Sequence, residues 1–184
     1  MTAPDSPGPE AGPEPAPRSF AVGYNPSGGE IYVYGGASLV VIGCIITAVQ
    51  GHPAALLLSL VGLGSTFYYR PLMEARRAQL GASMQGLYVE RIGVIGWRAI
   101  ADIDMVETYI RTMRFTKLVV TLSMPLDKAV VQPEIVTPWR RYTSRNWSLK
   151  GDRLEIKLDT LRADPEVVLR RVKALQKMAA SVQA

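Results

Sequence analysis

The chain has 184 residues, of which 48% are hydrophobic and 20% are charged, and its formal net charge is +5 at pH 7. A single cysteine, Cys44, and a single histidine, His52, exclude an intrachain disulfide and a zinc or iron centre built from several such ligands. We therefore expect no metal and no cofactor, and we assign no catalytic residues.

The charge is divided unevenly along the chain. Residues 1–69 carry a net charge of −3, whereas residues 70–184 carry +8. A basic soluble part is the expected arrangement beside an anionic membrane leaflet.

The first thirty residues are rich in proline, glycine, alanine and serine, and they hold almost no large apolar residue before Phe20. Such a segment cannot bury enough apolar surface to offset the entropy lost on ordering. Residues 1–30 are therefore predicted to be a disordered tail.

Two uncharged apolar runs follow, Ile31–Val49 and Ala54–Tyr69. At about 1.5 Å per residue the first run rises about 28 Å, close to the ~30 Å thickness of a bilayer's hydrocarbon core. The shorter second run can be completed by Pro53 in its first turn and by Arg70, whose long side chain can reach the headgroups. The runs predict a transmembrane helical hairpin; the alternative is a hairpin buried in a soluble core. The predicted ranges are 31–70 for the hairpin and 31–49 and 53–70 for its helices.

Orientation follows from the charges that flank the hairpin. The connecting loop 50–53 has no lysine or arginine, whereas Arg70, Arg76 and Arg77 follow the second run. By the positive-inside rule both termini are expected in the cytoplasm, which makes this a multi-pass protein of the cytoplasmic (inner) membrane.

Small residues recur on each apolar run, and small residues let helices approach closely in lipid. The predicted contact faces consist of Gly36 and Gly43 on the first helix and Ala55, Ser59 and Gly62 on the second.

Residues 71–82 have a helical composition and predict a juxtamembrane helix, and the period of the apolar pattern changes after them. Leu154, Ile156 and Leu158 alternate with charged residues, as in a strand with one buried face. The predicted strands are Gly86–Glu90, Gly93–Trp97, Ile100–Glu107, Lys117–Ser123, Trp147–Leu149 and Arg153–Asp159.

The chain ends in an amphipathic helix. Asp164 can cap its first turn and Pro165 fits its first position. Its apolar stripe consists of Val168, Val172, Leu175 and Met178, with Leu169 beside it. Together these elements predict an α+β chain, in which the hairpin precedes a small antiparallel sheet or partly open barrel, residues 83–184, capped by the C-terminal helix.

Three stretches, GLYVERIGVIGWRAIADIDMVE, FTKLVVTLSMPLDKA and DRLEIKLDTLRADPEVVLRRV, resemble the pleckstrin-homology-like (PH-like) domains of bacterial membrane proteins of unassigned function. In that family two N-terminal membrane helices precede the domain. The resemblance covers residues 84–180, although Ala99 stands where the family often has an aspartate. It implies a PH-like cytoplasmic domain and a membrane topology, and it implies no activity.

The segment Pro138–Trp147 gathers two tryptophans, a tyrosine and three arginines, inside a longer segment, 124–146, that predicts a helical turn or a surface flap. Arginines interleaved with aromatic rings can bind lipid headgroups or a protein, and they can stack on single-stranded nucleic acid, which is not the expected partner here. The alternative is that the tryptophans pack in the core while the arginines are solvated. The candidate contact residues are Trp139, Arg140, Arg141, Tyr142, Arg145 and Trp147.

These features favour a non-catalytic, membrane-anchored interaction or scaffold protein, such as an accessory or assembly subunit of a membrane complex. A second hypothesis is a sensor of anionic phospholipid headgroups that uses Arg140, Arg141 and Arg145. An enzyme is the third. Asp102 and Asp104 share a strand face and could do acid–base work, but this pattern is more often a solvated face.

Overall fold

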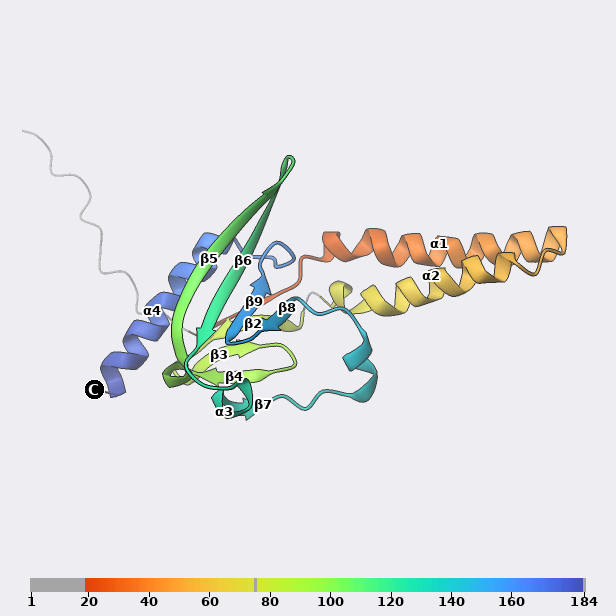
Figure 1. Cartoon of the computed structure of the whole chain (residues 1–184). Coiled ribbons are helices and arrows are strands. Elements are labelled where there is room, and N and C mark those ends of the chain that lie inside the picture. The colour runs from red at the N-terminus through yellow and green to blue at the C-terminus, as the bar shows by residue number, and fades with distance from the viewer. Residues whose placement is uncertain (1–18, 75, 184) are drawn as a thin grey trace, which may run out of the picture.

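The computed structural model describes residues 19–74 and 76–183. Figure 1 shows two long helices that lie side by side and project from one side of a β-rich part, with a further helix at the C-terminus. Residues 1–18 of the tail predicted for residues 1–30 lie outside the described residues.

The two projecting helices are α1 (Pro26–Gln50) and α2 (Ala55–Tyr69). They meet through the predicted small residues: a Cβ atom added at Gly36 would lie 2.7 Å from the carbonyl oxygen of Gly62. One added at Gly43 would lie 2.7 Å from the carbonyl oxygen of Ala55, and the Ser59 hydroxyl donates to the Val40 carbonyl at 3.1 Å. The predicted contact faces are therefore confirmed.

Within the part of the chain that the structure describes, one helix is long and apolar enough to cross a membrane, Gly29–Gln50, with a mean hydropathy of 2.0. Helix α2 has 15 residues, which rise about 22 Å, less than the ~30 Å hydrocarbon core. A second membrane-spanning helix is therefore not confirmed by length and composition.

The segment before the helix pair and the segment after it differ from the prediction. Residues 20–23, expected in the tail, form strand β1 (Phe20–Gly23). Residues 71–82, expected as a helix, form a 3-10 turn η1 (Arg70–Met73) and strand β2 (Ala78–Ala82). The two strands pair antiparallel, so the β-rich part begins at β1 rather than at residue 83. The strand forms despite the helical propensity of this segment, because Leu80 is then fully buried in the core.

Six of the remaining strands overlap their predicted positions, although β6 begins at Met113 rather than Lys117, and β7 (Val130–Pro133) is not among the predicted strands. A five-stranded antiparallel sheet has the order β1-β2-β3-β4-β7, and a four-stranded antiparallel sheet has the order β5-β6-β9-β8. The strands are β3 (Gly86–Val89), β4 (Gly93–Gly96), β5 (Ile100–Ile110), β6 (Met113–Leu122), β7 (Val130–Pro133), β8 (Trp147–Lys150) and β9 (Arg153–Lys157).

The predicted helical turn between residues 124 and 146 is present. Helix α3 (Leu126–Ala129) precedes β7, and a 3-10 turn η3 (Pro138–Tyr142) follows it. A further 3-10 turn, η2 (Trp97–Ala99), joins the two sheets between β4 and β5.

Helix α4 (Pro165–Gln183) covers the core with the predicted stripe. Val168, Val172 and Leu175 are at most 1% exposed, and Leu154 and Ile156 of β9 and Leu158 directly after it are equally buried. The Asp164 carboxylate accepts a hydrogen bond from the Glu166 N–H at 2.9 Å, as an N-cap does. The chain is thus an α+β protein with two antiparallel sheets and a C-terminal helix.

Adjacent residues of β9 test this packing. Ile156→Ala should lower the free energy of unfolding by ~2–5 kcal/mol, because it removes buried methyl groups from the centre of the core. Lys157→Ala, on the solvent side of the same strand, should stay within ~0.5 kcal/mol. Denaturant melts of the full chain in detergent, followed by tryptophan fluorescence, measure both. Equal losses would contradict the strand's orientation.

Candidate functional site at the base of the helix pair

The predicted aromatic and arginine segment lies against the end of α2 that faces the β-rich part. The Ser144 N–H donates to the Tyr68 carbonyl at 3.0 Å, and the rings of Phe67 and Trp139 have centroids 6.4 Å apart. On the same helix end, Tyr69 stacks on Tyr32 of α1 at 4.5 Å. Segment 138–144 therefore joins the aromatic end of the helix pair.

The structure separates the six candidate residues into two groups. Arg140 is 4% exposed; its Nη1 donates to Glu90 Oε1 at 2.9 Å, and its Nη2 pairs with Glu74. The indole N–H of Trp147 donates to the Glu90 carbonyl oxygen at 2.9 Å. Both side chains hold the fold together, so the prediction that Arg140 faces a headgroup is wrong, because two carboxylates already occupy its guanidinium group.

The other four candidates remain at the surface. Tyr142 is 76% exposed, Trp139 is 40% exposed, and Arg141 is exposed next to them. Arg145 is also exposed, with its guanidinium carbon 4.7 Å from the centroid of the Trp147 ring. These four side chains form a mixed aromatic and cationic surface beside the end of α2.

Glu90 is the centre of the buried polar cluster beneath that surface. It is 1% exposed, and besides Arg140 it lies 3.5 Å from Arg77 Nε and 3.9 Å from Arg91 Nε. Burial raises the pKa of the Glu90 carboxyl, and the surrounding guanidinium groups lower it without fully offsetting that effect. Burial also raises the pKa of Tyr24, which lies near the same carboxylate. The sequence does not single out Glu90, because the local pattern predicts only that this residue is the polar end of a short strand.

Glu134 holds a second set of bonds in the same region. Its carboxylate accepts hydrogen bonds from Arg77 Nη2 at 2.5 Å, from the Arg91 backbone N–H at 2.6 Å and from the Tyr88 hydroxyl at 3.0 Å. Partial burial alone would raise the pKa of Glu134, but these bonds outweigh it and hold that pKa below its ordinary value. Burial and the Glu134 carboxylate raise the pKa of Tyr88 to about 12.

Arg91 ties the turn between β3 and β4 to the same segment. Its guanidinium donates to the Thr143 carbonyl at 3.1 Å, to the Thr143 hydroxyl at 3.0 Å and to the Ser144 carbonyl at 2.5 Å. Three arginines, Arg77, Arg91 and Arg140, therefore connect the sheet, the segment after α2 and the segment around η3 into one polar cluster.

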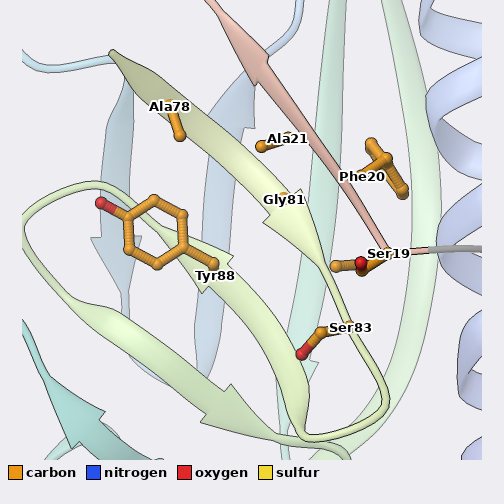
Figure 2. A pocket seen from close by; sticks show the side chains of 8 residues that line it. Ser19, Phe20, Ala21, Ala78, Gly81, Ser83 and Tyr88 are labelled. Carbon is orange, nitrogen blue, oxygen red and sulfur yellow. The ribbon is translucent and has the colours of Figure 1, made fainter.

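A groove of about 400 Å³ lies on the outer face of β1, β2 and β3. Figure 2 shows that small side chains, among them Ala21 and Ala78, leave this space beside the Tyr88 ring. The groove's lining contains no carboxylate, imidazole, thiol or amine, and the Tyr88 hydroxyl is already bonded to Glu134. It offers an apolar surface without reactive groups. The lining consists of Ser19, Phe20, Ala21, Ala78, Gly81, Ala82, Ser83 and Tyr88.

Within residues 19–74 and 76–183 there is no group of three or more His, Cys, Asp or Glu side chains that could hold a metal ion. Asp102 and Asp104 are both exposed on β5, as expected of a solvated strand face. No family model, curated protein or solved structure matches this chain.

Replacing Arg140 should destabilise the protein far more than replacing its neighbour. Arg140→Ala leaves the buried Glu90 carboxylate without its closest partner, and breaking a buried ion pair typically costs ~3–5 kcal/mol. Arg141→Ala, at the exposed position next to it, should stay within ~0.5 kcal/mol. Denaturant melts of the full chain in detergent compare the two variants. Similar stabilities would mean that the buried cluster is not formed.

The lowered pKa of Glu134 predicts a pH-dependent contribution to stability. An unfolded glutamate titrates near pH ~4.3, so a carboxyl whose folded-state pKa is lower stabilises the protein above that pH. The contribution is lost as the pH falls through the folded-state pKa. The free energy of unfolding of Glu134→Gln should therefore differ most from the parent at neutral pH, and the gap should narrow in acid. A gap that stays constant down to the acid limit would contradict this.

Proposed function

We propose that this protein is a non-catalytic, membrane-anchored interaction protein, whose PH-like domain is held at the cytoplasmic face of the membrane as an accessory or assembly subunit of a membrane complex. The observation that carries the proposal is the place of the helix pair in the chain. It is inserted between β1 and β2, which are hydrogen-bonded neighbours in one sheet.

This insertion supports a two-helix anchor. Because β1 and β2 are paired, the chain leaves the β-rich part and returns to it on the same side. If α1 crosses a bilayer, α2 has to bring the chain back. The apolar surface of α2 is consistent with that role: Leu57, Leu60, Val61 and Leu63 are each at least 59% exposed. Such a surface is suited to lipid.

The length of α2 is compatible with crossing a bilayer when its flanks are counted. Pro53 and Ala54 precede it, and η1 follows it directly with Arg70, whose side chain can snorkel to the headgroups. The flanking charges favour an orientation with both termini in the cytoplasm.

The buried cluster supports an interaction module rather than a tethered, freely moving domain. Bonds from Arg140 to Glu74 and from Ser144 to Tyr68 link the end of α2 to the segment around η3. The β-rich part is therefore held at a defined height and orientation relative to the helix pair. Such placement suits a surface that meets another membrane protein.

Two antiparallel sheets with a C-terminal helix are compatible with the PH-like domain that the sequence resembles, and we retain that assignment as part of the proposal. A second candidate function is the binding of anionic phospholipid headgroups. It is favoured by one observation, the exposed set of Trp139, Arg141, Tyr142 and Arg145 beside the end of α2.

Purification of the tagged full chain from its native membranes in mild detergent tests the proposal. We expect a protein partner at a fixed ratio. Gly43→Arg should lose both the membrane fraction and the partner, because a charge at mid-bilayer costs ~3 kcal/mol or more on insertion scales. Gly35, where an added Cβ has nothing within 4 Å, provides the matched control Gly35→Ala.

Two other results would change the assignment. Enrichment of anionic phospholipid without a protein partner, lost in an Arg141→Glu, Arg145→Glu variant, would favour the headgroup sensor. Recovery of neither a partner nor enriched lipid would contradict both functions.

A further inference from the structure

The hairpin of β5 and β6 extends beyond the sheet to which it belongs. Strand β9 pairs with β6 only between Lys117 and Thr121, and the residues after β9 make two further bonds to Thr116: the Leu158 N–H donates to its carbonyl, and its own N–H donates to the Asp159 carboxylate. Beyond Thr116 the ribbon has two strands, which pair with each other as far as Ile110 and Met113. We define residues 107–115 as the ribbon tip. Figure 1 shows the end of the ribbon projecting beyond the rest of the β-rich part, while Arg114 lies 3.8 Å from Glu166 at the start of α4.

The ribbon tip exposes large apolar side chains. Tyr109 is 66% exposed and Met113 is 58% exposed, and Val106 at the base of the tip is 44% exposed. A projecting two-stranded ribbon gains little from packing, so its exposed apolar residues contribute little to folding stability. They are placed where they can meet another surface.

Within the ribbon tip, residues 108–115 carry two cations and no acidic residue, and the one carboxylate, Glu107, stands at its first position. From Thr108 to Thr121 the chain carries Arg111, Arg114 and Lys117 and no acidic residue. Glu107 at the base of the tip is already engaged, since it pairs with Arg114 and accepts a bond from the Tyr109 hydroxyl at 3.2 Å. The apex therefore presents a cation among apolar side chains.

Arg111 occupies an uncommon backbone conformation for its residue type. Its φ is 56°, in the left-handed region that glycine and asparagine usually fill in a tight hairpin. A cation thus stands at the apex of the ribbon, in a position where a small turn residue would be the ordinary choice.

We infer that the ribbon tip is a second membrane contact, in which Tyr109 and Met113 enter the interface of the anionic cytoplasmic leaflet while Arg111 meets its headgroups. The inference rests on the proposed anchor, because the anchor places a bilayer beside the domain. In Figure 1 the ribbon leans toward the helix pair, and its tip and η3 lie on opposite sides of the base of that pair. Contacts at both places would prevent the domain and the helix pair from tilting together relative to the bilayer.

The chemistry of the tip favours lipid over a protein partner. Cations among tyrosine and methionine side chains suit an anionic interface, where the charge stays with the headgroups and the apolar body enters below them. A second copy of the chain would carry the same basic tip, so pairing of two tips would bring like charges together.

A fluorescent probe at the tip tests the inference. In a Cys44→Ala background, which removes the one native thiol, Met113→Cys is labelled with an environment-sensitive dye. The matched control is Asp152→Cys, in the turn at the opposite end of the same sheet, where the Asp152 carbonyl accepts a bond from the Leu122 N–H. Both labelled full chains are placed in nanodiscs of phosphatidylcholine and phosphatidylglycerol, with and without spin-labelled lipid.

We expect a blue shift and quenching by spin-labelled lipid at position 113 and neither at position 152. Arg111→Asn, which removes the charge and suits a positive φ, should weaken the quenching in anionic discs. Incorporation into discs without quenching at 113 would overturn the tip contact and leave the anchor standing. Failure of the unlabelled parent chain to enter discs would overturn both. A blue shift without quenching that requires two chains per disc would show a second copy on the tip, and would also overturn the inference.

Discussion

The pairing of β1 with β2 is the constraint on which the rest of the structure depends. Residues 20–23 and 78–82 are distant in sequence, and their antiparallel pairing closes the chain around the helix pair. Closing so long a segment costs entropy, and an ordered helical hairpin lowers that cost because its two ends already lie together. The sheet and the helix pair are consequently parts of one folding unit.

The polar cluster around Glu90 stabilises the same junction in a different way. Apolar packing alone would leave the end of α2 and the segment around η3 free to slide over the sheet. A buried carboxylate with guanidinium groups around it accepts few alternative arrangements, since any displacement leaves a charge without a partner. Arg140 reaches both Glu90 and Glu74, so one side chain connects the sheet to the segment that follows α2.

A rigid connection between the domain and the helix pair is what the proposed function requires. A domain attached by a flexible linker would sample many orientations at a membrane. This domain is joined to the helix pair through both β1 and β2, and it contacts the end of α2 again through the segment around η3. The ribbon tip and the exposed residues of η3 then lie at fixed places relative to the helix pair. A binding surface held in this way loses little orientational freedom when its partner arrives.

Local patterns in the sequence determined much of the chain. The alternation around Ile156, the stripe of α4 with its cap at Asp164, and the small residues at the helix contact each follow from nearest-neighbour geometry, and each is present in the structure. Ala78, Gln79 and Leu80 have good helical propensity, yet they lie in a strand, because differences in propensity of a few tenths of a kcal/mol are smaller than the free energy gained by burying one leucine.

Only the tertiary structure decided which charged side chains are buried in ion pairs and which remain in solvent. In sequence, Arg140 and Arg141 are adjacent and equivalent, and nothing local distinguishes them. In the fold, Arg140 lies within 2.9 Å of Glu90, a residue fifty positions away, while Arg141 remains in solvent. The pairing of β1 with β2 has the same origin. Contacts between residues far apart in the chain depend on how the elements assemble, and the patterns that mark single helices and strands carry no record of that assembly.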